Sequence, residues 1–210
     1  MGDSRSDFRP LAKAIAPGGA VVFNVGFRTD EVQQPGGPED AACAVRFAQA
    51  TGSAYGGDPA RITVFGLSAG AVVGALVALA GDQFGGDCAV GDVSALPAAL
   101  VGVMGPYDPT LSPGDPRPAL RQTDSACYEA LNPFTHLGGN PGLRVSLLHG
   151  ADDVDVPPEG SIQFHAALTA AGYIATLILL EGLGHEIPLP TSSAFDAIAR
   201  ETLKVARAER

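Results

Sequence analysis

The chain has 210 residues, of which 46% are hydrophobic, and its formal net charge is −10. This length and apolar content suit a single globular domain with a substantial core, and we expect residues 1–210 to form it. The acidic balance, with no basic stripe, excludes nucleic acid as an expected partner. No apolar run reaches transmembrane length and no signal-peptide pattern opens the chain, which favours a cytoplasmic protein; the alternative is a signal peptide lost by truncation of the N-terminus.

Strand-like and helix-like patterns alternate along the chain, which predicts an α/β fold with a mostly parallel sheet flanked by helices. Short apolar runs predict five strands, at residues 20–25, 61–66, 98–104, 143–149 and 175–180. Helical periodicity predicts helices near residues 5–16, 38–53, 69–81, 159–171 and 191–208. The candidate helix starts are Ser6, the run Pro38-Glu39-Asp40, and Ser192 or Ser193.

Two longer irregular segments interrupt this pattern. Residues 106–142 hold seven prolines and four glycines, and we expect either a lid-like insertion or a solvated connection without function. Residues 82–97 form a shorter loop. Cys88 and Cys127 lie in these two segments and could pair if the protein is exported, but the sequence leaves this pairing open. Cys43 lies in a helical pattern and is expected to be a small buried apolar residue.

Residues 66–70 spell Gly-Leu-Ser-Ala-Gly, a G-x-S-x-G pattern, between a predicted strand and a predicted helix. This context is that of a nucleophile elbow, a sharp turn that lifts a serine hydroxyl above the end of a parallel sheet. Gly66 and Gly70 lack side chains and so would let the strand and the helix approach closely. The pattern predicts Ser68 as a nucleophile; the structural alternative is a glycine-rich turn.

A serine hydroxyl needs a base to take its proton and a carboxylate to orient that base. In a sheet of this kind the partners follow the serine in the order acid, then histidine. Among four histidines, only His185 lies in a glycine-flanked loop after the last predicted strand, so we expect it to be the base. His149 closes a strand and is expected to be buried beside the acid loop.

Three carboxylates compete for the role of the acid. Asp152, Asp153 and Asp155 all follow the predicted strand 143–149. One of them should face the histidine, and the others should be solvated or bind backbone amides of the turn. The residues alone barely separate them.

These motifs resemble the carboxylesterase branch of the α/β-hydrolase superfamily, from about residue 5 to the C-terminus. The matching stretches are Tyr55–Thr63, similar to a GGDP-x-RIT lead-in; Ser68-Ala69-Gly70, similar to SAG; His149–Pro157, similar to an HG-x-x-D-x-x-VP acid loop; and Gly184-His185-Glu186, similar to a GH-x ending. The spacing of the acid loop favours Asp153 over its neighbours.

The resemblance implies a serine carboxylic-ester hydrolase that works through an acyl-enzyme. Ser68 would attack the ester carbonyl, His185 would take the proton and Asp153 would orient the imidazole. The backbone N–H of Ala69 would donate to the oxyanion. A small-molecule ester is the implied partner, no metal or organic cofactor is implied, and the oligomeric state stays open.

Two departures from the family pattern qualify this expectation. Phe27-Arg28 stands where the family usually has a Tyr-Arg pair. No HGGG-type oxyanion loop precedes the helix that begins near Ser6, so the first strands of the family sheet are expected to be missing through N-terminal truncation. Segment 20–25 should then either move over to pair with strand 61–66 or leave an empty slot beside it. The alternatives are therefore a catalytically impaired hydrolase-fold fragment or binding protein, and a serine peptidase of the same fold.

Overall fold

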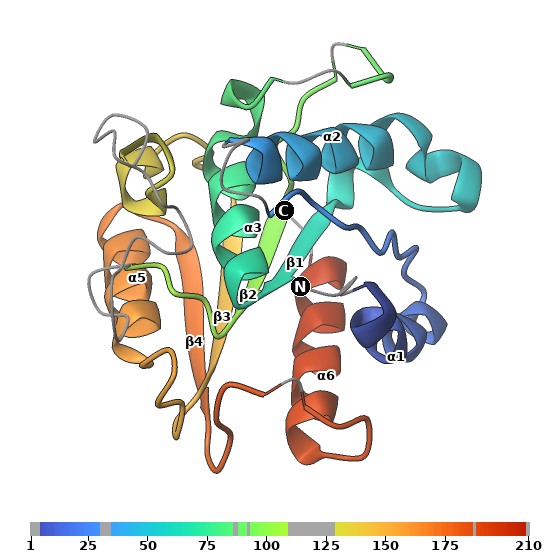
Figure 1. Ribbon diagram of the computed structural model, residues 1–210. Helices are drawn as coiled ribbons and strands as arrows, with labels where there is room; N and C mark the ends of the chain where they lie inside the picture. Colours follow the sequence, from blue (N-terminus) through green and yellow to red (C-terminus); the bar gives the residue numbers. More distant parts are fainter. Residues whose placement is uncertain are drawn as a thin grey trace.

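A parallel sheet of four strands forms the centre of the computed structural model, which describes residues 5–29, 35–85, 88–91, 93–108, 129–186 and 188–208. The strands lie in the order β1-β2-β3-β4 (Figure 1). Their bounds are Thr63–Leu67 for β1, Ala99–Val103 for β2, Arg144–Gly150 for β3 and Ile174–Leu180 for β4. Every neighbouring pair is parallel, which confirms the predicted fold class. The carboxyl ends of all four strands therefore meet at one edge.

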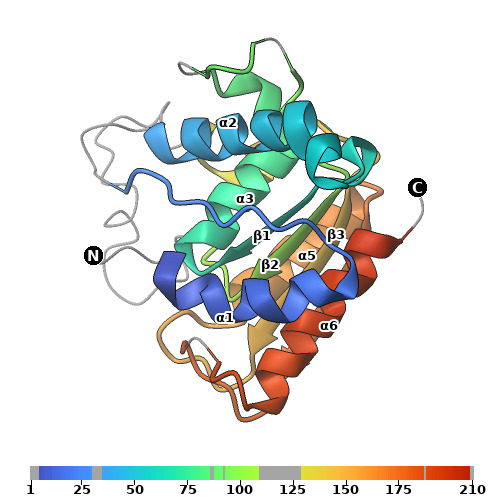
Figure 2. The same cartoon turned by 90° about the vertical axis from the view of Figure 1, so that its right-hand side faces the viewer.

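Helices cover both faces of the sheet (Figures 1 and 2). Their bounds are Arg5–Ile15 for α1, Gly36–Thr51 for α2, Ala69–Ala80 for α3, Glu159–Ala170 for α5 and Ser193–Arg207 for α6. Helices α1 and α6 pack on one face, around Leu11, Val101 and Ile198. Helices α3 and α5 pack on the other face, and α2 lies over α3.

The predicted helix starts are met in part. Ser192 caps α6, because its side chain accepts a hydrogen bond from the Phe195 N–H. Helix α2 begins at Gly36, two residues before Pro38, and has no side-chain cap at its N-terminus.

Of the predicted insertion at residues 106–142, residues 109–128 lie outside the described part of the chain. On its far side, a short 3-10 helix, Pro133–His136, packs against α3.

The prediction of a strand at residues 20–25 is wrong. This segment has an apolar pattern, but it forms no ladder with the sheet, and among the described residues β1 has only β2 as a neighbour. Figure 2 shows the segment crossing the molecule between α1 and α2. Side chains hold it instead: the Phe23 ring packs edge-on against Phe47 and Tyr55. Neither expected arrangement is found, because residues 20–25 neither pair with β1 nor form a second strand that faces it.

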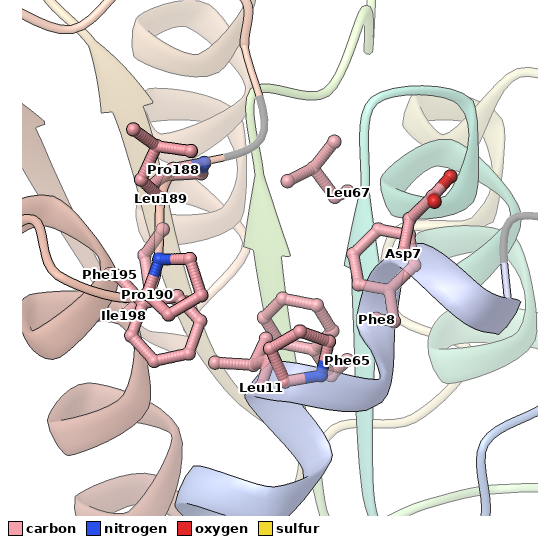
Figure 3. A pocket seen from close by; sticks show the side chains of 11 residues that line it. Asp7, Phe8, Leu11, Phe65, Leu67, Pro188, Leu189, Pro190, Phe195 and Ile198 are labelled. Atoms are coloured by element: carbon pink, nitrogen blue, oxygen red, sulfur yellow. The ribbon is translucent and has the colours of Figure 1, made fainter.

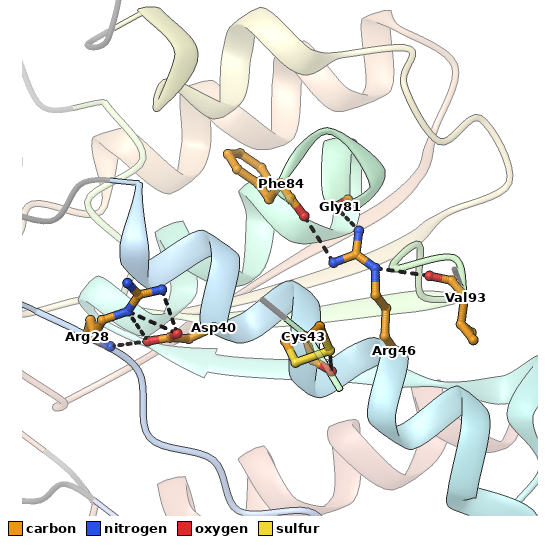
Figure 4. The surroundings of a disulfide bond; sticks show 8 residues. Arg28, Asp40, Cys43, Arg46, Gly81, Phe84 and Val93 are labelled. Carbon is orange, nitrogen blue, oxygen red and sulfur yellow. Dashed lines mark hydrogen bonds and ion pairs between the residues drawn. A yellow bond between two sulfur atoms is a disulfide. The ribbon is translucent and has the colours of Figure 1, made fainter. Parts of the chain in front are cut away.

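Arg28 fastens the end of this segment to α2 (Figure 4). Its guanidinium binds both carboxylate oxygens of Asp40, its Nη2 lies 3.1 Å from Glu39, and its backbone N–H donates to Asp40 at 2.8 Å. Partial burial by itself would raise the pKa of Asp40, but the hydrogen bonds and charge of Arg28 outweigh it and lower that pKa. Asp40 therefore serves as an anchor for residue 28.

The expectation for Cys43 is also wrong. Cys43 forms a disulfide with Cys88 and is not an unpaired apolar residue, and Cys88 is therefore not paired with Cys127 (Figure 4). The bond joins α2 to the loop that follows α3. Nearby, Arg46 donates to the carbonyl oxygens of Val93 and Phe84 and so ties the same two parts together. Disulfides are typical of oxidising compartments, which argues against the expected cytoplasmic location.

We expect the disulfide to leave one free thiol in the oxidised protein. Thiol titration in denaturant without reductant should count one cysteine, and titration after reduction should count three. The bridge closes a loop of 45 residues, so removing it by Cys43→Ala with Cys88→Ala should lower the free energy of unfolding by up to about 4 kcal/mol. Three reactive thiols in the unreduced protein, or equal melting temperatures, would contradict the pairing.

Candidate active site

Ser68 lies at a sharp turn between β1 and α3. Its backbone has φ 54° and ψ −124°, a conformation that is unusual for any residue except glycine. The Ser68 N–H donates to the carbonyl of Val103 at 2.8 Å, and its own carbonyl accepts from the Ala71 N–H. These bonds tie the strained residue to β2 and to the first turn of α3. Strain held in this way is typical of functional sites.

The two glycines of the turn differ in how much space they need. A methyl group on Gly66 would lie 2.1 Å from the carbonyl oxygen of Gly70, so this position requires glycine. A methyl group on Gly70 would meet only the ring of Phe27, at 3.7 Å, an ordinary contact. The close approach of strand and helix therefore depends on Gly66, and the expectation that it also depends on Gly70 is wrong.

Asp153 lies in the loop that follows β3 and is only 4% exposed. Its Oδ1 accepts two backbone hydrogen bonds, from the N–H groups of Asp155 and Val156, at 3.1 and 2.8 Å. Asp152 and Asp155 are exposed. The structure thus separates the three carboxylates that the residues alone did not.

The loops that follow β3 and β4 meet closely. A methyl group on Gly150, the last residue of β3, would lie 2.3 Å from the carbonyl oxygen of Leu183. The N–H of Asp152 donates to that same carbonyl at 3.0 Å. Because Gly150 has no side chain, the loop of Asp153 can lie directly against the loop of His185.

His185 connects Asp153 to Ser68. Its Nδ1 lies 2.7 Å from Asp153 Oδ2, and its Nε2 lies 2.9 Å from Ser68 Oγ. The imidazole is partly open to solvent, with 18% of its side chain exposed, whereas the Asp153 side chain is fully buried. Because a carboxylate only accepts, the proton of the neutral ring belongs on Nδ1, which leaves Nε2 free to accept from the serine hydroxyl.

The other three histidines make no contact with Ser68. His136 and His165 bind backbone carbonyls, of Ala130 and Ala175. His149 is buried beside the acid loop, as predicted, and its Nε2 lies 3.3 Å from Asp153 Oδ2. The i,i+4 spacing of His149 and Asp153 in the HG-x-x-D stretch was the only sequence signal for that contact.

The backbone N–H of Ala69 is the predicted oxyanion donor. Ala69 is the first residue of α3, so its N–H belongs to the first helical turn, where N–H groups have no intrahelical acceptor. The positive end of the helix dipole reinforces this turn as a place for negative charge. The turn therefore supplies one donor next to Ser68.

An apolar cavity of about 250 Å³ lies along the side of β1 that faces α1 and α6 (Figure 3). Leu67, the neighbour of Ser68, is part of its wall, and Asp7 is the only charged side chain among the described residues that line it. The other lining residues are Phe8, Pro10, Leu11, Phe65, Pro188, Leu189, Pro190, Phe195 and Ile198. The face of β1 that carries Phe65 and Leu67 thus borders an apolar cavity.

The described part of the chain contains no cluster of three or more histidine, cysteine or acidic side chains that is arranged to hold a metal ion. No helix in the same residues is long and apolar enough to cross a membrane.

Comparison with known proteins gives consistent results. The profile of the BD-FAE family matches residues 2–168. A probable isoprenylcysteine alpha-carbonyl methylesterase of Oryza sativa subsp. japonica is 27% identical over 81% of this chain and 45% of its own length. A protein of the same description from Arabidopsis thaliana is 30% identical over 70% of this chain and 38% of its own length. The chain thus spans less than half the length of these curated relatives.

Among solved structures, an acetyl ester-xyloside bifunctional hydrolase from Caldicellulosiruptor lactoaceticus superimposes with a TM-score of 0.80. It is 23% identical, and the match covers 93% of this chain and 74% of that one. At this identity the likeness shows the fold alone. The chain has the α/β-hydrolase fold of esterases and belongs to the BD-FAE family.

Proposed function

We propose that this protein is a serine carboxylic-ester hydrolase with Ser68, His185 and Asp153 as its catalytic triad. The observation that carries the proposal is the continuous hydrogen-bond chain from Ser68 Oγ through His185 to Asp153, with the serine in a strained turn. Its relatives are described as methylesterases, which agrees with a small ester substrate.

The geometry supports a two-step reaction. Ser68 Oγ forms a bond to the ester carbonyl carbon while its proton moves to His185 Nε2. The carbonyl oxygen becomes an oxyanion that the Ala69 N–H can stabilise. Collapse of this intermediate breaks the bond to the alkoxy oxygen, and His185 returns its proton to the departing alcohol. Water, deprotonated by His185, then attacks the acyl-enzyme and releases the carboxylic acid.

Asp153 stays ionised throughout this sequence. It holds the Nδ1–H tautomer of His185 and stabilises the imidazolium that forms when the serine proton is transferred. Its burial and its two backbone donors keep the carboxylate oxygen in place for that task. Because His185 is partly exposed, a substrate can approach the Ser68–His185 end of the hydrogen-bond chain.

The test is covalent labelling together with turnover. A fluorophosphonate, which reacts with activated serines, should modify the protein once, on the peptide that contains Ser68, as read by mass spectrometry. Hydrolysis of p-nitrophenyl acetate should be measurable but modest, with kcat/KM below ~10⁴ M⁻¹s⁻¹. The reason is that Ala69 is the only oxyanion donor assigned, and the lack of one donor costs about 10²–10³ in kcat. Modification of a different serine, or of none, would contradict the assignment.

A further inference from the structure

A second chain of polar contacts reaches Asp153 from the interior of the protein. His149, near the end of β3, lies between Asp153 and Ser161, a residue of the first turn of α5. Its Nδ1 is 2.7 Å from Ser161 Oγ. Its Nε2 is 2.8 Å from the carbonyl oxygen of Val156 and 3.3 Å from Asp153 Oδ2. Asp153 is thus placed between two histidines, each bound to a serine.

The partners of His149 determine its protonation. Both neighbours of Nε2, the Val156 carbonyl and the Asp153 carboxylate, can only accept, so Nε2 carries the proton. Its N–H donates to the Val156 carbonyl, and Asp153 Oδ2 lies 3.3 Å from the same nitrogen. Nδ1 is then the acceptor and receives the hydrogen bond of the Ser161 hydroxyl. Burial lowers the pKa of His149 and outweighs the carbonyl of Val156 and the charge of Asp153, which act in the opposite direction. The ring is therefore neutral, and its N–H group lies beside the Asp153 carboxylate.

Burial rules out this chain as a second reactive serine site. His149 and Ser161 are both 0% exposed, so no ester can reach them. The contact instead completes the surroundings of the Asp153 carboxylate. Two backbone N–H groups bind Oδ1, the Nδ1–H of His185 binds Oδ2, and Nε2 of His149 lies 3.3 Å from the same Oδ2. A buried carboxylate with three hydrogen-bond donors and a further N–H group beside it is stabilised as an anion and held in one orientation.

We propose that His149 is a positioning residue for catalysis: it holds Asp153 Oδ2 toward His185, and Ser161 keeps His149 in the tautomer that can do so. The proposal rests on the proposed function, because it concerns the acid of that triad. A purely structural role, in which His149 only anchors the loop through Val156, makes different predictions for the pH dependence of the reaction.

The first experiment compares His149→Leu with His149→Gln. Leucine removes the donor, whereas the glutamine amide can still donate from a similar place. An N–H dipole close to a buried carboxylate favours its charged form, so its loss makes the Asp153–His185 pair easier to protonate. In His149→Leu the acidic limb of the kcat/KM profile should move to higher pH by roughly half a unit or more. Its kcat should fall about tenfold with little change in KM. His149→Gln should restore most of both.

The neighbouring charges do not account for such a shift. Asp152, Asp155, Glu159 and Glu186 lie in the same two loops and at the start of α5, but all are exposed and are unchanged in these variants. Water screens them from the buried carboxylate. A displacement of the acidic limb therefore reports on the contact between His149 and Asp153.

The second experiment uses a smaller change, in case His149→Leu does not fold. Ser161→Ala removes the hydroxyl that sets the tautomer and leaves His149 in place, so it should shift the acidic limb in the same direction by less. Ser146→Ala is the matched control: Ser146 is 1% exposed on the same strand as His149, but its hydroxyl binds Glu201 at 3.0 Å. This control should change stability without moving the limb.

A readout that needs no turnover separates failure of this proposal from failure of the proposed function. The Nδ1 proton of His185, bound to Asp153, should appear far downfield in the proton NMR spectrum of the wild type and of His149→Gln. It should shift or disappear in His149→Leu. If the wild type shows no Ser68-dependent hydrolysis, the proposed function fails. The Nδ1 resonance of His185 still tests whether His149 positions Asp153. An unchanged resonance, or an unchanged pH profile and kcat in folded His149→Leu, overturns the role of His149.

Discussion

Replacing Ser68 with alanine is expected to lower kcat for p-nitrophenyl acetate by up to about 10⁶-fold, the cost of removing a triad nucleophile. Without Oγ the ester has no group to form the acyl-enzyme, and water would have to attack without a covalent intermediate. If the wild-type rate is modest, the measured loss will be limited by the background hydrolysis of the ester. The assay should therefore follow the burst of nitrophenol as well as the steady state, because the burst reports acylation directly.

Stability is the control for this substitution. Alanine at position 68 must adopt the same φ of 54°, and the Ser68 N–H bond to Val103 does not involve the side chain. The melting temperature of Ser68→Ala should therefore stay close to that of the wild type. Ser53→Ala, a change at an exposed serine outside the active-site turn, should leave both rate and melting temperature unchanged. Full hydrolytic activity in folded Ser68→Ala would remove Ser68 from the mechanism.

The helices and four of the strands could be predicted from the sequence because local patterns determine them. Unbroken apolar runs indicate strands that are covered on both faces, and β2 and β3 are buried in this way. Residues 20–25 carry the same apolar signal but form no strand. The apolar pattern of a segment indicates which side chains it can bury. Strand formation also needs a neighbouring strand at hydrogen-bond distance, and in the described part of the chain β1 pairs with β2 and not with residues 20–25.

The disulfide and the choice of the acid could not be predicted from local sequence patterns, because both depend on contacts between residues that are far apart in the chain. The partner of Cys88 depends on where α2 passes the loop after α3, and composition carries no such information. The choice among Asp152, Asp153 and Asp155 likewise depends on which carboxylate the turn points inward. Only the resemblance to a family motif separated them. The strain at Ser68, by contrast, was predictable, because a strand, a G-x-S-x-G turn and a helix meet there in consecutive residues.

Asp153→Asn is expected to have the second largest effect, a loss of roughly 10⁴-fold in kcat, as for the equivalent change in a well-studied serine protease. The backbone N–H groups of Asp155 and Val156 both require an acceptor at Oδ1, so the amide oxygen should occupy that place. The amide nitrogen then takes the position of Oδ2, and its two hydrogens point toward His185 and His149. An amide N–H group needs an acceptor, whereas both imidazoles present an N–H group at this place.

The exchange of an acceptor for a donor at the Oδ2 position explains why kcat should fall. To bind the amide, His185 would move its proton from Nδ1 to Nε2 and could no longer accept the proton of Ser68, 2.9 Å away. KM should change little, because Asp153 is buried and does not reach the substrate.

Asp152→Asn and Asp155→Asn are the matched controls, since both carboxylates are exposed, and each should keep kcat within a few-fold of the wild type. If Asp155→Asn lost activity while Asp153→Asn kept it, the acid of the triad would be Asp155. Because all three variants change one carboxylate to an amide and remove the same charge, a loss confined to position 153 would reflect the hydrogen bond to His185 and not the net charge of the loop.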